Sequence, residues 1–159
     1  NSKLFLKCSS FDIPKGRENF VKRLNNEISD KQLIIEGASS RTEYLDCYNK
    51  IDIVLDTFPA SGATTSFEAS YMGVPILTKI NKDNFWFKSG ESINKNLKMD
   101  DWIAQNEIEY VKKAIKFSED KNYLITLKKE LRNFALKSPL FNSHNYCEDF
   151  YEMLLNIKN

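Results

Sequence analysis

The sequence has few of the residues on which many kinds of functional site depend. It contains one histidine, His144, and three cysteines that lie far apart without Cys-x-x-Cys spacing. A zinc site with several histidines is therefore excluded, and a Ser-His-Asp triad would have to use His144. We interpret His144 as a surface or capping residue and expect no metal ion and no cofactor. The unpaired cysteines favour a reducing compartment, and hence a cytoplasmic protein.

The sequence also lacks a charge excess and a long apolar run. Lys and Arg total 23 and Asp and Glu total 22, so the net charge of +1 gives no reason to expect nucleic-acid or membrane binding. No apolar run approaches the roughly 18 residues needed to cross a bilayer. The chain begins with Asn1 and not Met. We therefore expect the natural N-terminus, and any targeting segment, to lie upstream.

The residues that are present predict a globular α/β protein. Apolar residues make up 42% of the 159 and aromatic residues 13%, which suits one domain with a real core. Strand-like runs at 3–7, 32–37, 51–58 and 75–79 alternate with helical patterns. This alternation predicts βαβ units in a Rossmann-like parallel sheet with flanking helices. The run at 51–58, "IDIVLDTF", is the strongest, and its β-branched and apolar residues predict a strand buried on both faces.

The predicted helices carry signals at their ends. Ser40 and Glu43 have the spacing of a capping box, and Gly73 follows a helix predicted from Thr65 to Met72. Further helices are predicted over 85–97, after a capping Asn106, over 121–137, and around the apolar residues from Tyr146 to Ile157. We expect a single, truncated domain, with an α/β part over about 1–80 and a helical part over about 85–159.

A turn of small residues follows the run at 51–58: residues 55–75 read "LDTFPASGATTSFEASYMGVP". In an open parallel sheet, ligands bind beyond the carboxyl ends of the strands. Gly62 keeps bulk away from the backbone, and the N–H groups of Thr64, Thr65 and Ser66 would be free at a helix N-terminus. Such donors and the helix dipole favour an anion. Glu68, one turn along, is placed to accept both hydroxyls of a ribose.

A second interpretation of this turn is purely structural. Thr65-Ser66-Phe67-Glu68 matches a capping box in its own right. Neither G-x-G-x-x-G nor G-x-x-x-x-G-K-[ST] occurs, so neither standard phosphate loop is supported. From these residues alone, a helix cap and an anion site both remain open.

Two separated segments resemble the O-linked N-acetylglucosamine transferase family, which includes the SPINDLY-like proteins. Residues 48–78, "YNKIDIVLDTFPASGATTSFEASYMGVPILT", are similar to the family pattern D-x-x-L-D-T-x-P-x-x-x-x-T-T-x-x-D-x-L-x-x-G-x-P-x-V-T. Residues 131–154, "LRNFALKSPLFNSHNYCEDFYEML", are similar to its closing S-P-L-F-(N/D) segment and last helix. The resemblance covers about residues 30–159. It implies a GT-B glycosyltransferase, with this chain from the donor-binding Rossmann-like lobe and UDP-N-acetylglucosamine or another UDP-sugar as the donor.

The resemblance also implies roles for single residues. Thr64 and Thr65 match the pair that holds the pyrophosphate, and Glu68 matches a ribose-binding position where the family usually has Asp. In addition, Ser39 and Arg41 match a segment that contacts the uracil edge.

Three further positions depart from the family pattern. Tyr44 matches a position where a family His stacks on uracil, and an aromatic ring can do the same. It is also placed to be a helix residue packed on the sheet. After "PILT" the sequence has "KINKDNFWFKSGES" in place of a Gly-rich turn and a Ser-Arg pair. Lys88 is the residue there that can replace the Arg, and Ala63 stands where some members have His.

The resemblance further implies parts that are missing from this chain. These are the acceptor-side lobe, the TPR repeats that recruit protein acceptors, and a first strand and helix whose lysine neutralises the diphosphate leaving group. We find no convincing catalytic residue and expect the isolated chain to be inactive. The missing strand would be the central one in the order 3-2-1-4-5. The strands at 3–7 and 51–58 would then pair directly or leave an edge for another chain, and we expect a homo-oligomer.

Other functions remain as alternatives. Asp56 at a strand end resembles the phosphoacceptor of a receiver domain, but the acidic pair and the late strand with Lys that such a domain needs are missing. A GT-B transferase that uses another nucleotide sugar stays open, and so does a non-catalytic nucleotide-binding module. The acceptor can be a protein, a peptide or a small carbohydrate.

Overall fold

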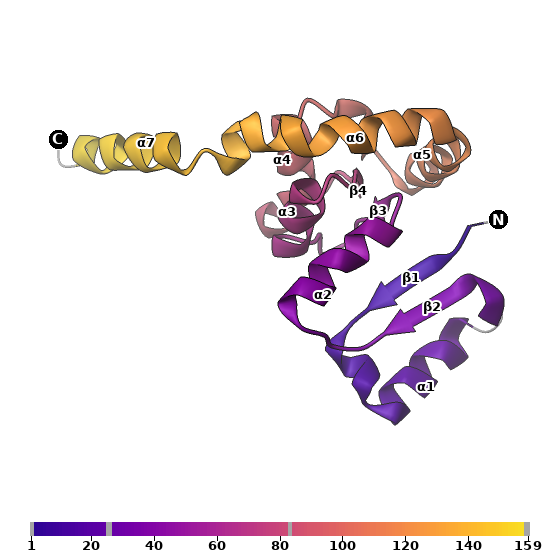
Figure 1. Ribbon diagram of the computed structural model, residues 1–159. Helices are drawn as coiled ribbons and strands as arrows, with labels where there is room; N and C mark the ends of the chain where they lie inside the picture. The colour runs from indigo at the N-terminus through magenta and orange to yellow at the C-terminus, as the bar shows by residue number, and fades with distance from the viewer. Residues whose placement is uncertain (1, 25–26, 83, 158–159) are drawn as a thin grey trace. The chain divides into compact units, whose positions relative to one another are not determined.

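The computed structural model describes residues 2–24, 27–82 and 84–157. The chain divides into two compact units, Asn1–Ile51 (the N-terminal unit) and Asp52–Asn159 (the C-terminal unit) (Figure 1). The boundary falls inside the part predicted to be α/β, well before the change to helical structure near residue 85. No helix within the described ranges has the length and apolarity to cross a bilayer.

The N-terminal unit is a small two-stranded parallel sheet with helices. Its elements are β1 (Leu4–Lys7), η1 (Ser9–Asp12), α1 (Pro14–Leu24), η2 (Asp30–Gln32), β2 (Leu33–Glu36), α2 (Arg41–Asp46) and η3 (Cys47–Lys50). The strands pair in register from Leu4 opposite Leu33 to Lys7 opposite Glu36. Both strands therefore form as predicted, and α1 begins at Pro14 because proline suits the first helical position.

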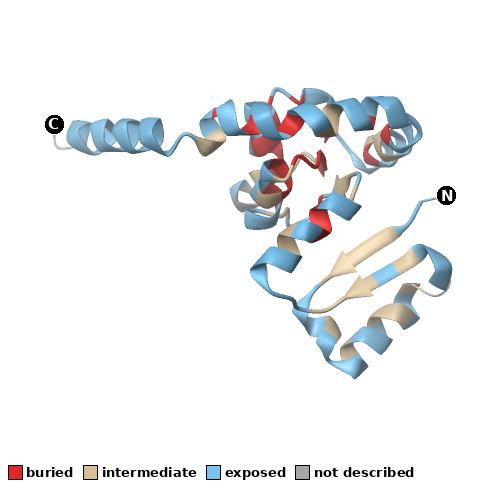
Figure 2. Ribbon diagram, viewed as in Figure 1, coloured by how far each residue is buried: buried red, intermediate tan, exposed pale blue. Residues whose placement is uncertain are grey.

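The C-terminal unit holds a second parallel sheet, in the order β3-β4-β5. Its elements are β3 (Val54–Leu55), α3 (Thr64–Tyr71), β4 (Ile76–Lys79), η4 (Phe85–Phe87), α4 (Ser89–Asn96), η5 (Asp100–Trp102), β5 (Ile103–Ala104), α5 (Glu107–Glu119), α6 (Lys121–Lys137), η6 (Pro139–Phe141) and α7 (Ser143–Asn156). Helices α3, α4 and α5 pack on β4, and α6 packs on α3 and α5. Figure 2 shows buried residues gathered where these elements meet, and Ile76, Leu77 and Trp102 are among the most deeply buried.

The strand predicted over 51–58 is much shorter in the structure. Only Val54 and Leu55 form β3, and Leu55 is 48% exposed, so the expectation of a strand buried on both faces is wrong. The reason is that, within the ranges that the structure describes, β3 is an edge strand that pairs with β4. The pairing runs from the Val54 N–H on Pro75 O to the Asp56 N–H on Leu77 O, both 2.9 Å. Strands β1 and β3 belong to separate sheets, so the direct pairing considered for them is not found among the described residues. Association through an open edge stays a prediction.

The helical expectations agree closely with the structure. Helix α6 spans 121–137 as predicted, Asn106 caps α5, and Gly73 follows α3 with a φ of 79°.

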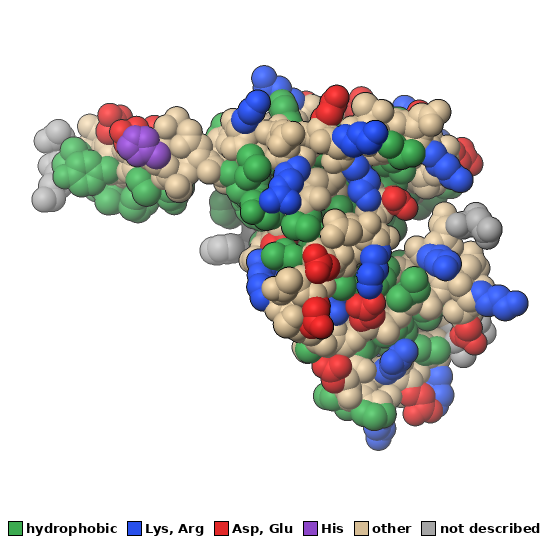
Figure 3. All heavy atoms as spheres, viewed as in Figure 1, with side chains coloured by type: hydrophobic (Ala, Val, Ile, Leu, Met, Phe, Trp, Pro, Cys, Tyr) green, Lys and Arg blue, Asp and Glu red, His purple; other side chains and the backbone are tan. Residues whose placement is uncertain are grey.

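Helix α7 contacts η6 and keeps its large apolar residues exposed. Hydrophobic side chains gather along one side of it in Figure 3, whereas acidic side chains and the histidine lie elsewhere. His144 is a surface residue, as expected, and lies 3.4 Å from Glu148.

Candidate functional site

The turn between β3 and α3 is organised around the buried side chain of Asp56. This residue is 5% exposed. Its Oδ1 accepts the N–H of Gly62 and its Oδ2 accepts the O–H of Thr78, each at 2.7 Å. Its main-chain oxygen accepts the O–H of Tyr110 at 2.9 Å. The side chain is thus enclosed and engaged by its neighbours, which argues against the exposed phosphoacceptor of a receiver domain.

The burial of this cluster changes the acidity of its members. Burial raises the pKa of Asp56 above its ordinary value, although the bonds from Gly62 and Thr78 partly oppose the change. Burial, reinforced by the Asp56 charge, raises the pKa of Tyr110 well above its ordinary value. Both effects reflect the cost of keeping a negative charge away from water.

The rest of the turn is fixed by bonds to its backbone. Thr57 donates its O–H to the oxygen of Ala60 at 2.7 Å, and Asn81 donates its side-chain N–H to the oxygen of Pro59 at 3.2 Å. The peptide bond between Phe58 and Pro59 is cis. These contacts hold the chain on both sides of the bend that leads to α3.

Helix α3 begins at Thr64 without a side-chain cap. Its N-cap residue is Ala63, which has no capping side chain, and Thr65 lies at the second helical position. The capping box read from Thr65 to Glu68 is therefore not formed. The N–H of Ser66 donates to Ala63 O at 3.1 Å, so the expectation that this amide is free is wrong. The two exposed threonines lie where an α-helix has N–H groups without an intrahelical partner.

Gly62 lies very close to the start of α3. A Cβ at this position would lie 2.8 Å from both Thr65 Oγ1 and Ser66 Oγ, closer than side chains tolerate. Glycine therefore allows the turn to approach the helix. Glu68 is partly buried and lies four residues after Thr64, so the two share one face of α3.

The start of α4 packs on the same buried carboxylate. A Cβ at Gly90 would overlap Oδ2 of Asp56 and Oγ1 of Thr78, so helix backbone lies directly against them. Lys88 is the N-cap residue of α4 and lies two positions before this contact. The structure thus brings the turn before α3 and the start of α4 to the carboxyl end of the sheet, where parallel sheets bind ligands.

The predicted uracil-binding residues lie in the N-terminal unit. Ser40 and Glu43 form the expected capping box at the start of α2. Beside it, the Ser39 hydroxyl donates to Ser40 O at 3.4 Å. Arg41 and Tyr44 lie together, with the guanidinium carbon 5.7 Å from the ring centroid.

Tyr44 has packing contacts of its own. Its hydroxyl is 3.0 Å from that of Tyr48, and the two rings meet edge to face at 5.7 Å. These contacts are with Tyr48 of η3. For Tyr44, packing on the sheet and stacking on a base both stay predictions.

Two hollows lie at opposite ends of the sheet in the C-terminal unit. One, of about 440 Å³, borders the turn and is lined by Phe58, Pro59, Lys79, Ile80, Asn81, Lys82, Gln105 and Glu107. There Lys79 Nζ lies 4.0 Å from the Phe58 ring centroid and 3.0 Å from Glu107.

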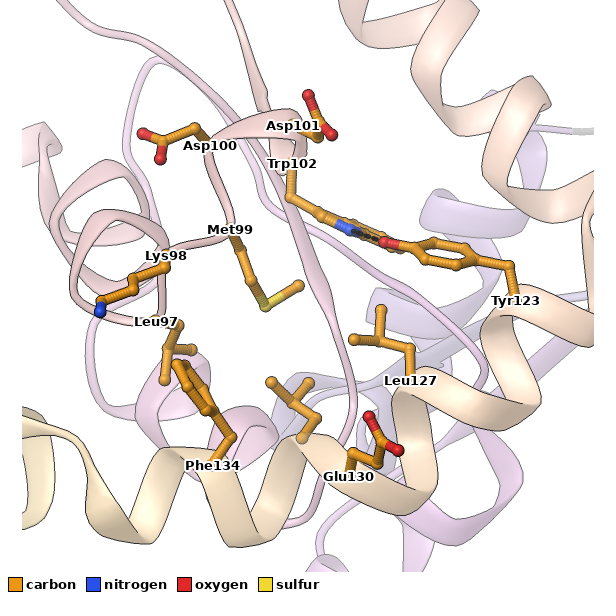
Figure 4. A pocket seen from close by; sticks show the side chains of 11 residues that line it. Leu97, Lys98, Met99, Asp100, Asp101, Trp102, Tyr123, Leu127, Glu130 and Phe134 are labelled. Atoms are coloured by element: carbon orange, nitrogen blue, oxygen red, sulfur yellow. Dashed lines mark hydrogen bonds between the residues drawn. The ribbon is translucent and has the colours of Figure 1, made fainter.

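The second hollow, of about 490 Å³, is formed by the segment that precedes β5 and by α6 (Figure 4). The N–H of Trp102 donates to the Tyr123 hydroxyl at 3.1 Å along its wall. Its lining combines apolar side chains with the carboxylates of Asp100, Asp101 and Glu130. These carboxylates make it unsuited to a diphosphate.

Some of the important contacts were not found from the sequence. Asp56 was weighed only as a phosphoacceptor, and Thr78 and Tyr110 were not singled out. Gly90 lies inside the helix predicted over 85–97, and a glycine within a helix was the available signal for a close approach. Among the described residues, no group of three or more His, Cys, Asp or Glu is placed to hold a metal ion.

Comparison with known proteins assigns the chain to a family. The profile of glycosyl transferase family 41 matches residues 10–150. The chain therefore belongs to glycosyl transferase family 41, which confirms the resemblance seen in its motifs. The GT-B type of α/β fold is confirmed by an O-GlcNAc transferase mutant, K341M, from Thermobaculum terrenum. That structure has a TM-score of 0.84 and 27% identity over 94% of this chain and 29% of its own.

Curated relatives agree with this assignment. A Solanum lycopersicum protein named "Probable UDP-N-acetylglucosamine--peptide N-acetylglucosaminyltransferase SPINDLY" is 33% identical over 94% of this chain. A Giardia intestinalis protein named "UDP-N-acetylglucosamine--peptide N-acetylglucosaminyltransferase" is 25% identical over 89% of it. The chain spans only 16% and 10% of the lengths of these two relatives.

Proposed function

We propose that this chain is the UDP-sugar-binding lobe of a glycosyltransferase that transfers N-acetylglucosamine, or a related sugar, to a protein or peptide acceptor. The observation that carries the proposal is the start of α3. Thr64 and Thr65 are exposed there, no side chain caps the helix, and the turn before it is fixed at the carboxyl end of the sheet. Membership of glycosyl transferase family 41, and the glycosyltransferase activity for which the relatives are named, support the transfer of a sugar from a nucleotide donor.

The diphosphate of the donor would bind at this helix start. Thr64 and Thr65 offer hydroxyl donors and the first N–H groups of α3, and the helix dipole contributes about 0.3–1 kcal/mol for a nearby anion. Lys88, at the start of α4, would add a positive charge. Glycosyl transfer leaves negative charge on the departing diphosphate, so the same donors would stabilise the leaving group.

The nucleoside would be recognised by other side chains. Glu68 lies one helical turn after Thr64 and would accept the ribose hydroxyls, a role that acidic residues fill in dinucleotide sites. Tyr44 would stack on the base, and Ser39 and Arg41 would contact its edge. The acceptor would bind through regions outside this chain, and we expect the isolated chain to transfer no sugar. Turnover in an acceptor-glycosylation assay with the pure chain would contradict that expectation.

Calorimetric titration of the chain with UDP, UDP-N-acetylglucosamine, GDP and ADP tests the proposal. We expect the uridine nucleotides to bind, Thr65→Val to abolish binding, and Tyr44→Ala to weaken it by roughly tenfold, since stacking on a base contributes about 1–3 kcal/mol. Thr126→Val, at an exposed threonine of α6, is the matched control and should bind normally. A preference for GDP or ADP would favour a transferase with another donor, and no binding by any nucleotide would reject the proposal.

A further inference from the structure

We propose that Asp56 is a positioning residue for the donor diphosphate. Its carboxylate holds the turn before α3 and the start of α4 in the arrangement that offers Thr64, Thr65 and Lys88 to one ligand. This inference rests on the proposed function of that site and adds a residue that does not itself touch the donor.

The two carboxylate oxygens of Asp56 contact different segments of the chain. Oδ1 accepts the N–H of Gly62, two residues before α3 begins, at 2.7 Å. Oδ2 accepts the hydroxyl of Thr78 on β4 at 2.7 Å and lies against the backbone of Gly90 in α4. One side chain therefore joins three segments that are far apart in the sequence. Two of these segments carry the proposed diphosphate ligands.

The position of Gly62 bears directly on Thr65. Because Gly62 lies so close to Thr65 Oγ1, a shift of the turn would move this hydroxyl or collide with it. A proposed diphosphate ligand is thus coupled to Asp56 through a single hydrogen bond. Preorganised donors are the ones that stabilise a developing charge well, since they need no rearrangement when the charge appears.

The electrostatics also suggest a role beyond stability. Asp56 is buried, and none of the ion pairs recorded for the described residues includes it. A buried charge without a cation is costly, and a neutral side chain would avoid this cost. We infer that the Asp56 carboxylate contributes to donor binding by positioning the turn before α3 and the start of α4.

The first test replaces Asp56 by its nearest neutral analogue. Asp56→Asn keeps the size of the side chain, but it weakens the bond to Gly62 because hydrogen bonds to a charged acceptor are about twice as strong as neutral ones. We expect the affinity for UDP-N-acetylglucosamine to fall by roughly tenfold while circular dichroism and thermal unfolding show a folded protein. Asp101→Asn, at an exposed carboxylate of η5, is the control and should bind as the wild type does.

The second test follows the affinity for UDP-N-acetylglucosamine with pH. Each of its phosphates has one ester and one anhydride linkage and keeps only a strongly acidic ionisation. The diphosphate therefore does not titrate between about pH 5 and 8, where a phosphate monoester would. We expect the affinity to fall as Asp56 is protonated. Asp56→Asn should remove this dependence. Thr78→Val should move its midpoint to higher pH, because the anion loses a hydrogen-bond donor.

Other titratable groups lie on the elements packed around Asp56. They include Glu68 on α3, Lys79 on β4, Lys88 and Glu91 near the start of α4, and Tyr110 on α5. The midpoint of the pH dependence is assigned to Asp56 if it is unchanged in Glu68→Gln and in Glu91→Gln and is shifted in Thr78→Val. A purely structural role of Asp56 would not produce this combination.

The outcomes separate this inference from the function on which it rests. If the wild-type chain does not bind UDP-N-acetylglucosamine, the proposed function fails and the inference fails with it. If the wild type binds and Asp56→Asn binds within twofold of it, only the inference is overturned. Should Asp56→Asn not fold, Thr78→Val decides: an unchanged midpoint overturns the inference, and a raised midpoint supports it.

Discussion

Helices α2 and α3 begin with the same sequence signature and have different starts. Ser40 and Glu43 form a complete capping box. The Ser40 hydroxyl accepts the N–H of Glu43, and the Glu43 carboxylate accepts the N–H of Ser40. Thr65 and Glu68 have the same spacing, but Thr65 lies inside α3 and the N-cap residue is Ala63. At the start of α2 the Ser40 hydroxyl accepts the N–H of Glu43, whereas at the start of α3 the N-cap residue Ala63 makes no side-chain cap.

The difference arises from contacts that the local sequence does not contain. The start of α2 needs only a local contact, because Ser40 at the N-cap bonds with Glu43, three residues further along the chain. Before α3 the turn is tied to Asp56 through Gly62, and Gly90 and Thr78 close around that carboxylate. Local bonds should therefore decide the stability of the start of α2, and distant residues that of the start of α3.

The largest effect should follow from Gly90→Ala. In an exposed helix this change stabilises by about 1 kcal/mol, because alanine is the better helix former. Here the new Cβ would overlap Asp56 and Thr78, so we expect a loss of about 1–3 kcal/mol, as for overpacked cores, together with loss of nucleotide binding. Urea unfolding measures the loss. Ser92→Ala, on the exposed face of the same helix, should change stability by no more than about 0.5 kcal/mol.

A smaller effect should separate the two helix starts directly. Ser40→Ala removes a real cap and should cost about 1 kcal/mol in the free energy of unfolding. Thr65→Ala leaves the N-cap residue Ala63 unchanged and places a better helix former inside α3, so we expect a smaller loss of stability than for Ser40→Ala. The same urea experiment compares them. Equal losses would mean that Thr65 caps its helix after all.

The same contrast explains what the sequence could predict. The capping box of α2, the stop at Gly73 and the limits of α6 depend on residues within a few positions of one another, and each was predicted correctly. The strand over 51–58 was predicted too long because its length depends on which neighbours it pairs with. The Asp56 cluster could not be found in this way, because Thr78 and Tyr110 lie 22 and 54 residues from it. For the candidate site, motif resemblance named the residues, and their binding roles remain predictions.

The smallest effect should appear in how two backbone amides respond to pH. Glu43 accepts from the hydroxyl and N–H of Ser40, which lowers the pKa of its carboxyl, whereas burial raises the pKa of Asp56. The signs for stability are then opposite. The contribution of Glu43 is present above its unfolded pKa of about 4.3 and is lost as pH falls through the lowered folded pKa, whereas protonating Asp56 relieves the cost of a buried charge and favours folding. Protonation of Asp56 would therefore reduce donor affinity without unfolding the turn.

In an NMR titration the Ser40 amide should shift with a midpoint below about 4.3, and the Gly62 amide with a midpoint above the ordinary Asp value of about 3.9. A Gly62 midpoint at or below the ordinary Asp value would show that the carboxylate is hydrated, and the two helix starts would then not differ in the way proposed.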